Sequence, residues 1–366
     1  MPVKRTHLRV AAFAAAGVLA ATALTACADD ASSGSGSGAD AGAGSTGGTA
    51  AGAAKDATKV KIMVGGLDKV IYLPAVLTQR LGFFQAEGLD VTLMTEPAGV
   101  QATTALVSGD VQGAVGFYDH TLDLQTKGKH VESVVQFSQA PGEVEVVSSK
   151  AAGDITAAKD FKGKKLGVTG LGSSTDFLTK YLAVHNGLKV SDFTPVAVGA
   201  GQTFIAALQQ GSIQAGMTTD PTVAQILDKG AGKVLYDMRT PEGSRQALGG
   251  LYPSSSLYMN TDWVDSHQET VQKLANAFVK TLRWMSTHTP EEIAAKMPAD
   301  YAQGGARLYA QSIKATLPMF TTDGVMPQGG PETVESVLKA FNPNLRHATV
   351  DLSQTYTTRF VENVAP

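Results

Sequence analysis

The sequence predicts an α/β fold of two lobes, each with a mostly parallel sheet flanked by helices, and a ligand cleft between the lobes. The first observation behind this prediction is that strand-like and helix-like segments alternate along the chain, which is typical of parallel sheets. The second is a sequence pattern that occurs in two copies. The third is size: the 366 residues, 43% of them hydrophobic, are enough for two lobes with cores of their own.

The strand predictions come from short apolar runs bounded by turn residues. Such runs lie at residues 60–64, 91–94, 113–117, 131–137, 165–168 and 194–198. Two helices between them are clear from their apolar spacing, one at residues 73–81 that ends at Gly82 and one at residues 176–184. From Trp263 onward, the pattern is mainly helical.

The first residues have the layout of an export signal, because basic residues precede an apolar run at 10–24 that is short for a membrane span. The run ends in the letters LTAC at residues 24–27, which resemble the lipobox of bacterial lipoproteins. This resemblance implies a signal peptide at 1–26 and a lipid on Cys27 that anchors the protein to the outer face of the cell membrane. The alternative is an ordinary signal peptide with an incidental cysteine.

Residues 27–58 consist largely of Gly, Ser, Ala, Thr and Asp, a composition that buries little apolar surface. We expect a flexible tether there. The formal net charge of −3, without a basic run, argues against nucleic acid as a partner. Because Cys27 is the only cysteine, the chain can form no internal disulfide.

A weak internal repeat supports two similar lobes. The letters ALVSGDVQG at residues 105–113 are echoed by ALQQGSIQA at 207–215. Each copy continues through a short strand and a turn into a helix that ends in Lys-Gly, at 127–128 and at 229–230. Strand ends and helix N-termini of two such lobes would face each other across a cleft. The alternative is that helix–glycine–strand units recur in any α/β protein.

Three stretches resemble the nitrate, sulfonate and taurine family of substrate-binding lipoproteins from bacterial ABC importers. They are LGFFQAEGLDV at 81–91, DFKGKKLGV at 160–168 with GSST following at 172–175, and TTDP at 218–221. The resemblance implies a monomeric protein without a cofactor that captures a small organic solute. It also implies partners, namely a membrane permease and its ATPase.

The same resemblance implies a two-lobed periplasmic-binding-protein-like fold of type II. Its first lobe would span residues 59–150 and its second lobe 151–250. The chain would return to the first lobe at 251–366, where helices buttress that lobe. Lobe closure would be a hinge motion at two crossover strands, near Val147 and Leu257.

Loops that follow the predicted strands contain the candidate ligand-binding residues. The candidates are Gly66, Leu67, Asp68, Tyr72, Phe117, Tyr118, Asp119, His120, Gly172, Ser173, Ser174, Thr175, Gly201, Thr218, Thr219 and Asp220. Glycines let the backbone approach a ligand closely, and aromatic rings beside a carboxylate and an imidazole suit an organic solute. The hydroxyls and free amides at 172–175 would bind an oxygen-rich group at a helix start.

Each loop also has a structural alternative. The glycines fit tight turns, the Ser and Thr residues fit plain helix caps, and Asp119 and Asp220 fit N-caps, with His120 as a partner of the first. Three aspartates in the cleft, with only Arg239 or Arg245 in reach, argue against a simple inorganic anion. We expect an organic solute with a polar or cationic nitrogen, such as an amino-sulfonate, a pyrimidine or an aromatic acid.

Two other functions compete with transport. A lipoprotein of this kind could instead sense its solute for a membrane receptor. The pyrimidine synthase of thiamine biosynthesis also resembles these binding proteins, but it needs a cysteine-rich, iron-handling segment, and here Cys27 is the only cysteine. Because the histidines show no metal-binding spacing and no catalytic triad is visible, we expect no metal site and no enzyme activity.

Overall fold

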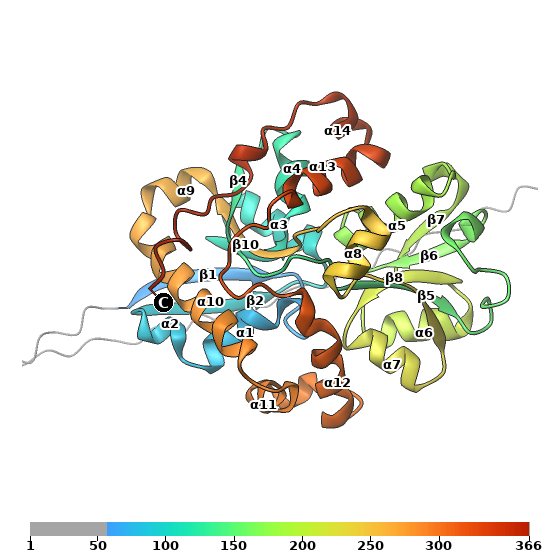
Figure 1. Cartoon of the computed structure of the whole chain (residues 1–366), viewed down its shortest axis with the longest axis horizontal. Coiled ribbons are helices and arrows are strands. Elements are labelled where there is room, and N and C mark those ends of the chain that lie inside the picture. The colour runs from blue at the N-terminus through green and yellow to red at the C-terminus, as the bar shows by residue number, and fades with distance from the viewer. Residues whose placement is uncertain (1–56, 366) are drawn as a thin grey trace, which may run out of the picture. The chain divides into compact units, whose positions relative to one another are not determined.

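The structure, a computed structural model, describes residues 57–365 (Figure 1). The predicted signal peptide, Cys27 and nearly all of the tether lie outside the described residues. Everything described belongs to one compact unit, Lys55–Pro366. Within residues 57–365, no helix has the length and apolar character that crossing a membrane requires.

The first lobe is built on a five-stranded sheet in the order β2-β1-β3-β10-β4. Its strands are β1 (Thr58–Val64), β2 (Leu89–Thr95), β3 (Gly113–Phe117), β4 (Val131–Gln136) and β10 (Ser255–Asn260). Strand β1 runs parallel to β2 and β3, whereas β10 is antiparallel to both of its neighbours. Strand β10, which returns from the other lobe, therefore runs opposite to its neighbours in this sheet.

The second lobe has the same arrangement, in the order β7-β6-β8-β5-β9. Its strands are β5 (Glu143–Ser148), β6 (Lys165–Val168), β7 (Thr194–Ala197), β8 (Ala215–Thr219) and β9 (Gly232–Asp237). Here β5 is the reversed strand, antiparallel to β8 and β9. Because β5 already pairs in the second sheet, the chain changes lobes before Glu143, whereas the predicted first lobe extended to residue 150.

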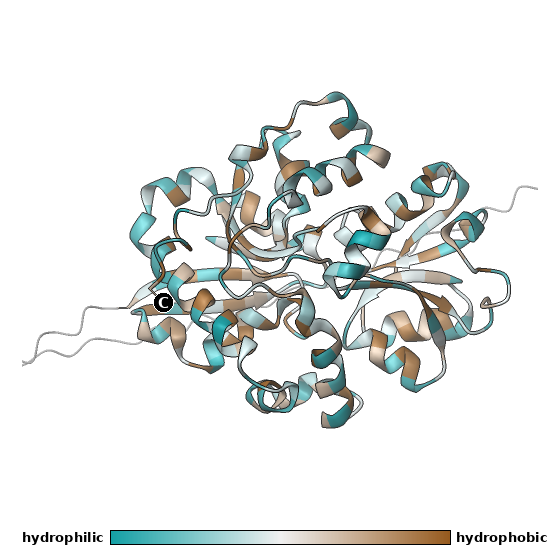
Figure 2. Ribbon diagram, viewed as in Figure 1, coloured by the Kyte–Doolittle hydropathy of each residue, from teal (hydrophilic) through white to brown (hydrophobic). Residues whose placement is uncertain are grey.

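Helices cover the sheets, and hydrophobic residues recur along their inner sides (Figure 2). The first lobe has α1 (Leu73–Arg80), α2 (Phe83–Ala86), α3 (Gly99–Ser108) and α4 (Asp119–Gln125). The second has α5 (Ser174–His185), α6 (Gln202–Gln210), α7 (Thr222–Asp228) and α8 (Pro241–Leu248). The tail contains α9 (Thr261–Ser266), α10 (Gln268–Ser286), α11 (Pro290–Lys296), α12 (Ala306–Thr316), α13 (Gly330–Phe341) and α14 (Pro343–His347).

The internal repeat corresponds to two copies of one structural unit. Helix α3, strand β3 and helix α4 form the first copy, and α6, β8 and α7 form the second. The helix that opens each copy ends at a glycine with positive φ, Gly109 at 84° and Gly211 at 79°. Only glycine adopts this left-handed cap without strain, which explains why it recurs in both copies.

The helical tail packs on both lobes. Helix α10 lies on α1 and α2, where Phe278 contacts Phe84 and Phe137 at ring-centroid distances of 5.3 and 4.8 Å. Farther along, α12 packs against α7 and α13 packs against α5, both of which belong to the second lobe. The tail was expected to buttress the first lobe, and in the structure it also ties the second lobe to the first (Figure 1).

Candidate functional site

A small polar cavity lies where the two lobes meet. The first lobe contributes Lys69, Ile71, Tyr72 and Gly99, and the second contributes Glu143, Thr169, Ser173, Ser174, Thr175 and Thr219. The cavity is contracted to about 10 Å³, close to the room that one water molecule needs. A cavity of this size has no room for a solute of several atoms.

Hydrogen bonds between the lobes hold the cavity closed. Ser174 Oγ, on the second lobe, donates to Asp119 Oδ1 of the first at 2.9 Å. The amide of Val70 donates to the carbonyl oxygen of Asp220 at 3.0 Å. On the tail, Thr316 Oγ1 donates to the Asp220 carboxylate at 3.3 Å. Asp119 of the first lobe thus faces a hydroxyl group of the second, and Asp220 of the second lobe faces a hydroxyl group of the tail.

Asp119 is a buried acidic group that adjoins the cavity through its hydrogen bond with Ser174. Its side chain is fully buried at the start of α4, and Tyr252 Oη donates to its Oδ2 at 2.8 Å. Burial raises the pKa of Asp119, although His120, Tyr252 and Ser174 act in the opposite direction. His120 Nδ1 lies 3.8 Å from Asp119 Oδ1, which is beyond hydrogen-bond distance.

A second buried carboxyl group, Glu143, enters the cavity from β5. Burial raises its pKa well above the ordinary range, and the nearby Asp119 adds to this, while Lys69 opposes it. Its Oε2 has no hydrogen-bond partner among the described residues. An orphaned polar atom beside a cavity is a position at which a ligand can supply the missing partner.

Lys69 is the cation of the cavity. Its Nζ donates to the carbonyl oxygens of Gly65 at 2.6 Å and Pro97 at 2.9 Å. Burial lowers the pKa of Lys69 to about 8, against the raising effect of Asp68 and Glu143. Gly66 has a φ of 123°, and a Cβ there would lie 2.6 Å from the Lys69 side chain. Glycine at this position therefore makes room for the lysine.

The start of α5 brings hydroxyl groups to the cavity. Ser173 occupies the N-cap position, but no side chain caps this helix. Thr175 Oγ1 instead accepts from the amide of Thr169 at 3.0 Å, and Ser174 faces Asp119. Plain capping therefore does not account for these hydroxyls.

Comparison with known proteins identifies the family. The family model described as NMT1/THI5 like matches residues 71–293. The chain belongs to the NMT1/THI5-like family. A solved structure of a protein from Bordetella bronchiseptica RB50 is 34% identical, with a TM-score of 0.80 over 84% of this chain and 96% of that one.

Two further relatives of this NMT1/THI5-like protein differ in what they do. The alkanesulfonate-binding protein SsuA from Xanthomonas axonopodis pv. citri, bound to MOPS, has a TM-score of 0.67 at 17% identity, covering 83% of this chain and 99% of that one. The 4-amino-5-hydroxymethyl-2-methylpyrimidine phosphate synthase THI13 of Saccharomyces cerevisiae is 31% identical over 162 residues, 43% of this chain. The chain spans about half the length of the curated relatives it matches, 45% in this case.

These relatives confirm the predicted resemblance and the two-lobed binding-protein fold. They contradict the expectation that the protein is not an enzyme, because the curated relatives at 31% identity are named as synthases. That expectation rested on the single cysteine and on missing motifs. Motif absence was a weak argument, since catalytic groups assemble in space from distant segments.

Of the predicted site residues, the structure brings one group together at the cavity of this family member. Tyr72, Ser173, Ser174, Thr175 and Thr219 line it. Asp119 and His120 adjoin it through Ser174 and Gly99. Thr218 and Thr219 are buried, and the hydroxyl oxygens of both lack a partner among the described residues.

Other predicted residues face elsewhere. Tyr118 bonds through its hydroxyl group to Thr355 and contacts the ring of Tyr356, so it points toward the tail. Phe117 belongs to the core, Asp68 is exposed, and Leu67 packs against core residues. Gly201 donates its amide to Thr222, and Gly172 donates its amide to Asp176.

Asp220 has the structural role that its sequence position suggested as an alternative. Its Oδ1 accepts from the amide of Ala224 at 3.1 Å, at the start of α7. Its Oδ2 forms an ion pair with Arg239 at 2.9 Å. Of the two arginines that could reach the predicted aspartates, Arg239 pairs with Asp220, so Asp220 already has its cation.

Sequence reasoning missed Lys69, Glu143, Gly99 and Tyr252. The strand letters EVEVVS at 143–148 carried a usable signal, because Glu143 and Glu145 interrupt an otherwise apolar strand. A strand buried on both faces excludes charged residues unless they have a function or a partner. Nothing local distinguished Lys69, Gly99 or Tyr252.

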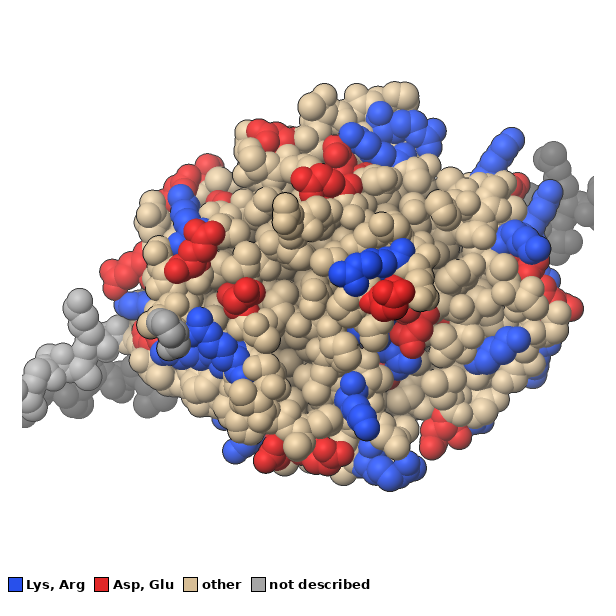
Figure 3. All heavy atoms as spheres, in the orientation of Figure 1, with Lys and Arg blue, Asp and Glu red and all other residues tan. Residues whose placement is uncertain are grey.

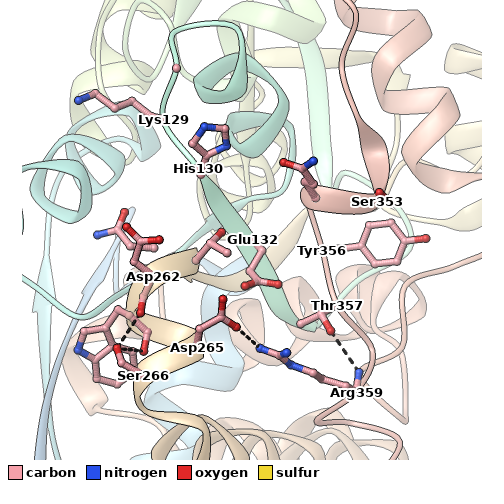
Figure 4. Close-up of a pocket in the computed structure, with 15 residues that line it drawn as sticks. Lys129, His130, Glu132, Asp262, Asp265, Ser266, Ser353, Tyr356, Thr357 and Arg359 are labelled. Atoms are coloured by element: carbon pink, nitrogen blue, oxygen red, sulfur yellow. Dashed lines mark hydrogen bonds and ion pairs between the residues drawn. The ribbon is translucent and has the colours of Figure 1, made fainter.

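A more open hollow of about 1020 Å³ lies at the edge of the first lobe (Figure 4). Figure 4 shows Glu132, Asp265 and Arg359 around it, and Arg359 is paired with Asp265 at 2.9 Å. Every side chain that lines this hollow comes from the first lobe or the tail. Closure of the lobes therefore does not enclose a solute there.

Proposed function

We propose that the protein is an extracytoplasmic solute-binding protein of an ABC importer and that its solute is a small nitrogen heterocycle of the aminopyrimidine class. The observation that carries this proposal is a pair of buried carboxyl groups at a cavity formed by both lobes: Glu143 lines the cavity, and Asp119 adjoins it through Ser174. The structural likeness to solute-binding proteins supports the transport role.

The environment of Glu143 favours an aminopyrimidine. Burial raises the pKa of Glu143 well above its ordinary range, which favours the protonated carboxyl group. A neutral carboxyl group donates one hydrogen bond and accepts another, which matches a ring nitrogen beside an exocyclic amino group. Asp119 adds a second acceptor for donor groups. A simple inorganic anion would instead meet acidic groups from both lobes.

The remaining groups suit the substituents of such a ring. The α5 N-terminus and the hydroxyls of Ser173 and Ser174 favour a hydroxyl or anionic substituent. Tyr72 offers an aromatic ring that is held edge-on by Phe117 at a centroid distance of 6.3 Å. We propose that solute binding replaces the Ser174–Asp119 hydrogen bond as the link between the lobes.

The cellular setting is part of the same proposal. A lipid on Cys27 would keep the protein at the outer face of the membrane, and the tether would let both lobes reach a permease and its ATPase. On the face shown in Figure 3, charged side chains of both signs are interspersed. That pattern favours a small-molecule ligand over a nucleic acid.

A second candidate function is pyrimidine phosphate synthesis, which the names of the curated relatives favour. The clustered titratable groups Asp119, Glu143, Lys69 and His120 are compatible with proton transfer. The two candidates share one class of ligand and differ in whether the protein makes it or captures it.

Titration calorimetry with an aminopyrimidine panel tests the proposal, with taurine, alkanesulfonates and nitrate as comparison ligands. We expect 4-amino-5-hydroxymethyl-2-methylpyrimidine or a close analogue to bind, and excess ligand at a hundred times Kd to add about 2.7 kcal/mol of stability. Binding of nitrate alone would reject the proposed ligand class. If expression of the full chain lets a pyrimidine auxotroph grow without added pyrimidine, the synthase function would be favoured.

A further inference from the structure

A second hollow of about 350 Å³ adjoins the cavity on the outer side of His120. The first lobe contributes α3 and α4, and the second lobe contributes Gly172 and Phe177. Asn342 and Asn344, at the junction of α13 and α14, complete the lining. Like the cavity, this hollow is therefore shared between the lobes, and the same lobe motion opens both.

His120 forms the wall between the two spaces. Its ring is 3% exposed and packs edge-on against Phe177 at a centroid distance of 5.8 Å. A Cβ on Gly99, which lines the cavity, would lie 2.9 Å from His120 Nε2. This Nε2 is buried and has no hydrogen-bond partner in the described part of the chain. It is thus an orphaned polar atom at the boundary.

The lining of the hollow combines apolar side chains with polar ones and is electrically balanced. Val100, Val107, Leu124 and Phe177 supply its apolar surface, and Thr103, Thr104, Asn342 and Asn344 add uncharged polar groups. Its acidic group, Asp123, is neutralised by Lys127 at 2.6 Å and accepts a hydrogen bond from Asn342 at 3.1 Å. A charged ligand group would find no unpaired opposite charge on these side chains. An uncharged ring or short acyl chain would cover apolar surface there.

We propose that this hollow is a second subsite for the same solute, which takes an uncharged ring or acyl substituent attached to the heterocycle. His120 Nε2 hydrogen-bonds the group that links the two parts. This inference rests on the proposed function, because it requires the heterocycle of the solute to occupy the cavity beside Asp119 and Glu143. The solute is then a two-part molecule whose halves lie on either side of His120.

The test compares two probes on the full chain by titration calorimetry. The parent probe is 4-amino-5-aminomethyl-2-methylpyrimidine, and the extended probe is its N-benzoyl derivative, whose amide supplies the linking group. We expect the extended probe to bind at least tenfold tighter than the parent. Equal or weaker binding of the extended probe would overturn the subsite and leave the proposed function standing. Failure of both probes to bind would overturn the proposed function, and the subsite with it.

A filling variant separates the subsite from general effects. Val107→Trp places an indole in the hollow and should reduce the ratio of affinities, extended probe over parent probe, to near one. Val107→Leu fills less of the hollow and should give an intermediate ratio. Val190→Trp, at an equally half-buried valine of the second lobe, is the matched control and should keep the ratio. An unchanged ratio in both Val107 variants would contradict the assignment.

Discussion

The two copies of the repeat place an aspartate at corresponding points, and the two aspartates have different environments. Asp119 follows β3 and Asp220 follows β8, and both are fully buried with a pKa raised by burial. Asp220 has Arg239 at 2.9 Å and caps α7. Among the described residues, Asp119 accepts from the hydroxyl groups of Ser174 and Tyr252, and His120 lies 3.8 Å away. The aspartate that is paired with Arg239 contributes structure, and we propose that the other one meets the solute.

A third carboxyl group, Glu145 on β5, extends this comparison, because no cation among the described residues lowers its pKa. Burial raises the pKa of Glu145 to about 8, and only the hydrogen bond from Thr179 opposes this. The folded protein thus holds a proton that the unfolded chain has lost between pH 4.5 and about 8. Stability from this group is present below pH 4.5 and is lost as pH rises to about 8.

Glu145→Gln should therefore flatten the fall of unfolding free energy across that pH range. Integrated over that pH range, the expected difference in slope amounts to about 5 kcal/mol, from 1.36 kcal/mol per pKa unit. Urea unfolding at several pH values measures it, with Glu291→Gln at an exposed position of α11 as the control. If the unfolding free energies of the wild type and Glu145→Gln change with pH in the same way, the raised pKa of Glu145 is contradicted.

Removing the paired aspartate should cost stability. Asp220→Ala leaves Arg239 with Asp237 alone and removes the cap of α7, so we expect the free energy of unfolding to fall by about 3 kcal/mol. Chemical denaturation measures this loss. Arg239→Met is the partner variant, and a double-mutant cycle of the two should show strong coupling; additive effects would mean that the ion pair contributes little.

Removing the charge of the other aspartate should instead cost affinity. Asp119→Asn keeps the shape but replaces the anionic acceptor, and we expect aminopyrimidine binding to weaken about 30-fold, or about 2 kcal/mol. Titration calorimetry measures the change. Asp220→Asn is the matched control and should weaken binding much less. Equal losses of affinity in Asp119→Asn and Asp220→Asn would contradict the proposed difference between the two aspartates.

The smallest effects concern the hydroxyl groups that cross between the lobes. Ser174→Ala removes the bond to Asp119, and Thr316→Val removes the bond to Asp220. Each change should favour the open form by about 1 kcal/mol. Fluorescence energy transfer between dyes on the two lobes reports the shift without ligand. No shift in either variant would mean that these bonds do not hold the lobes together.

Much of this architecture was predictable because its signals are local. The apolar runs at 113–117 and 165–168 coincide with β3 and β6, and the repeated glycines mark helix ends in both copies. Ser173, Ser174 and Thr175 were predicted as site residues because they follow a strand end, and the structure places them at the cavity. Adjacent residues were harder, because side chains diverge around a helix: Asp119 faces Ser174, whereas Tyr118 faces the tail.

By itself, the sequence determined the two-lobed α/β fold, the repeat and the family, because strand, helix and turn preferences act over short stretches of chain. Only the tertiary structure decided which charges meet. Lys69, Glu143 and Tyr252 come from three distant segments, and their joint position follows from the packing of two sheets and a returning strand. The pairing of Arg239 with Asp220, and not with Asp119, is likewise a consequence of long-range packing.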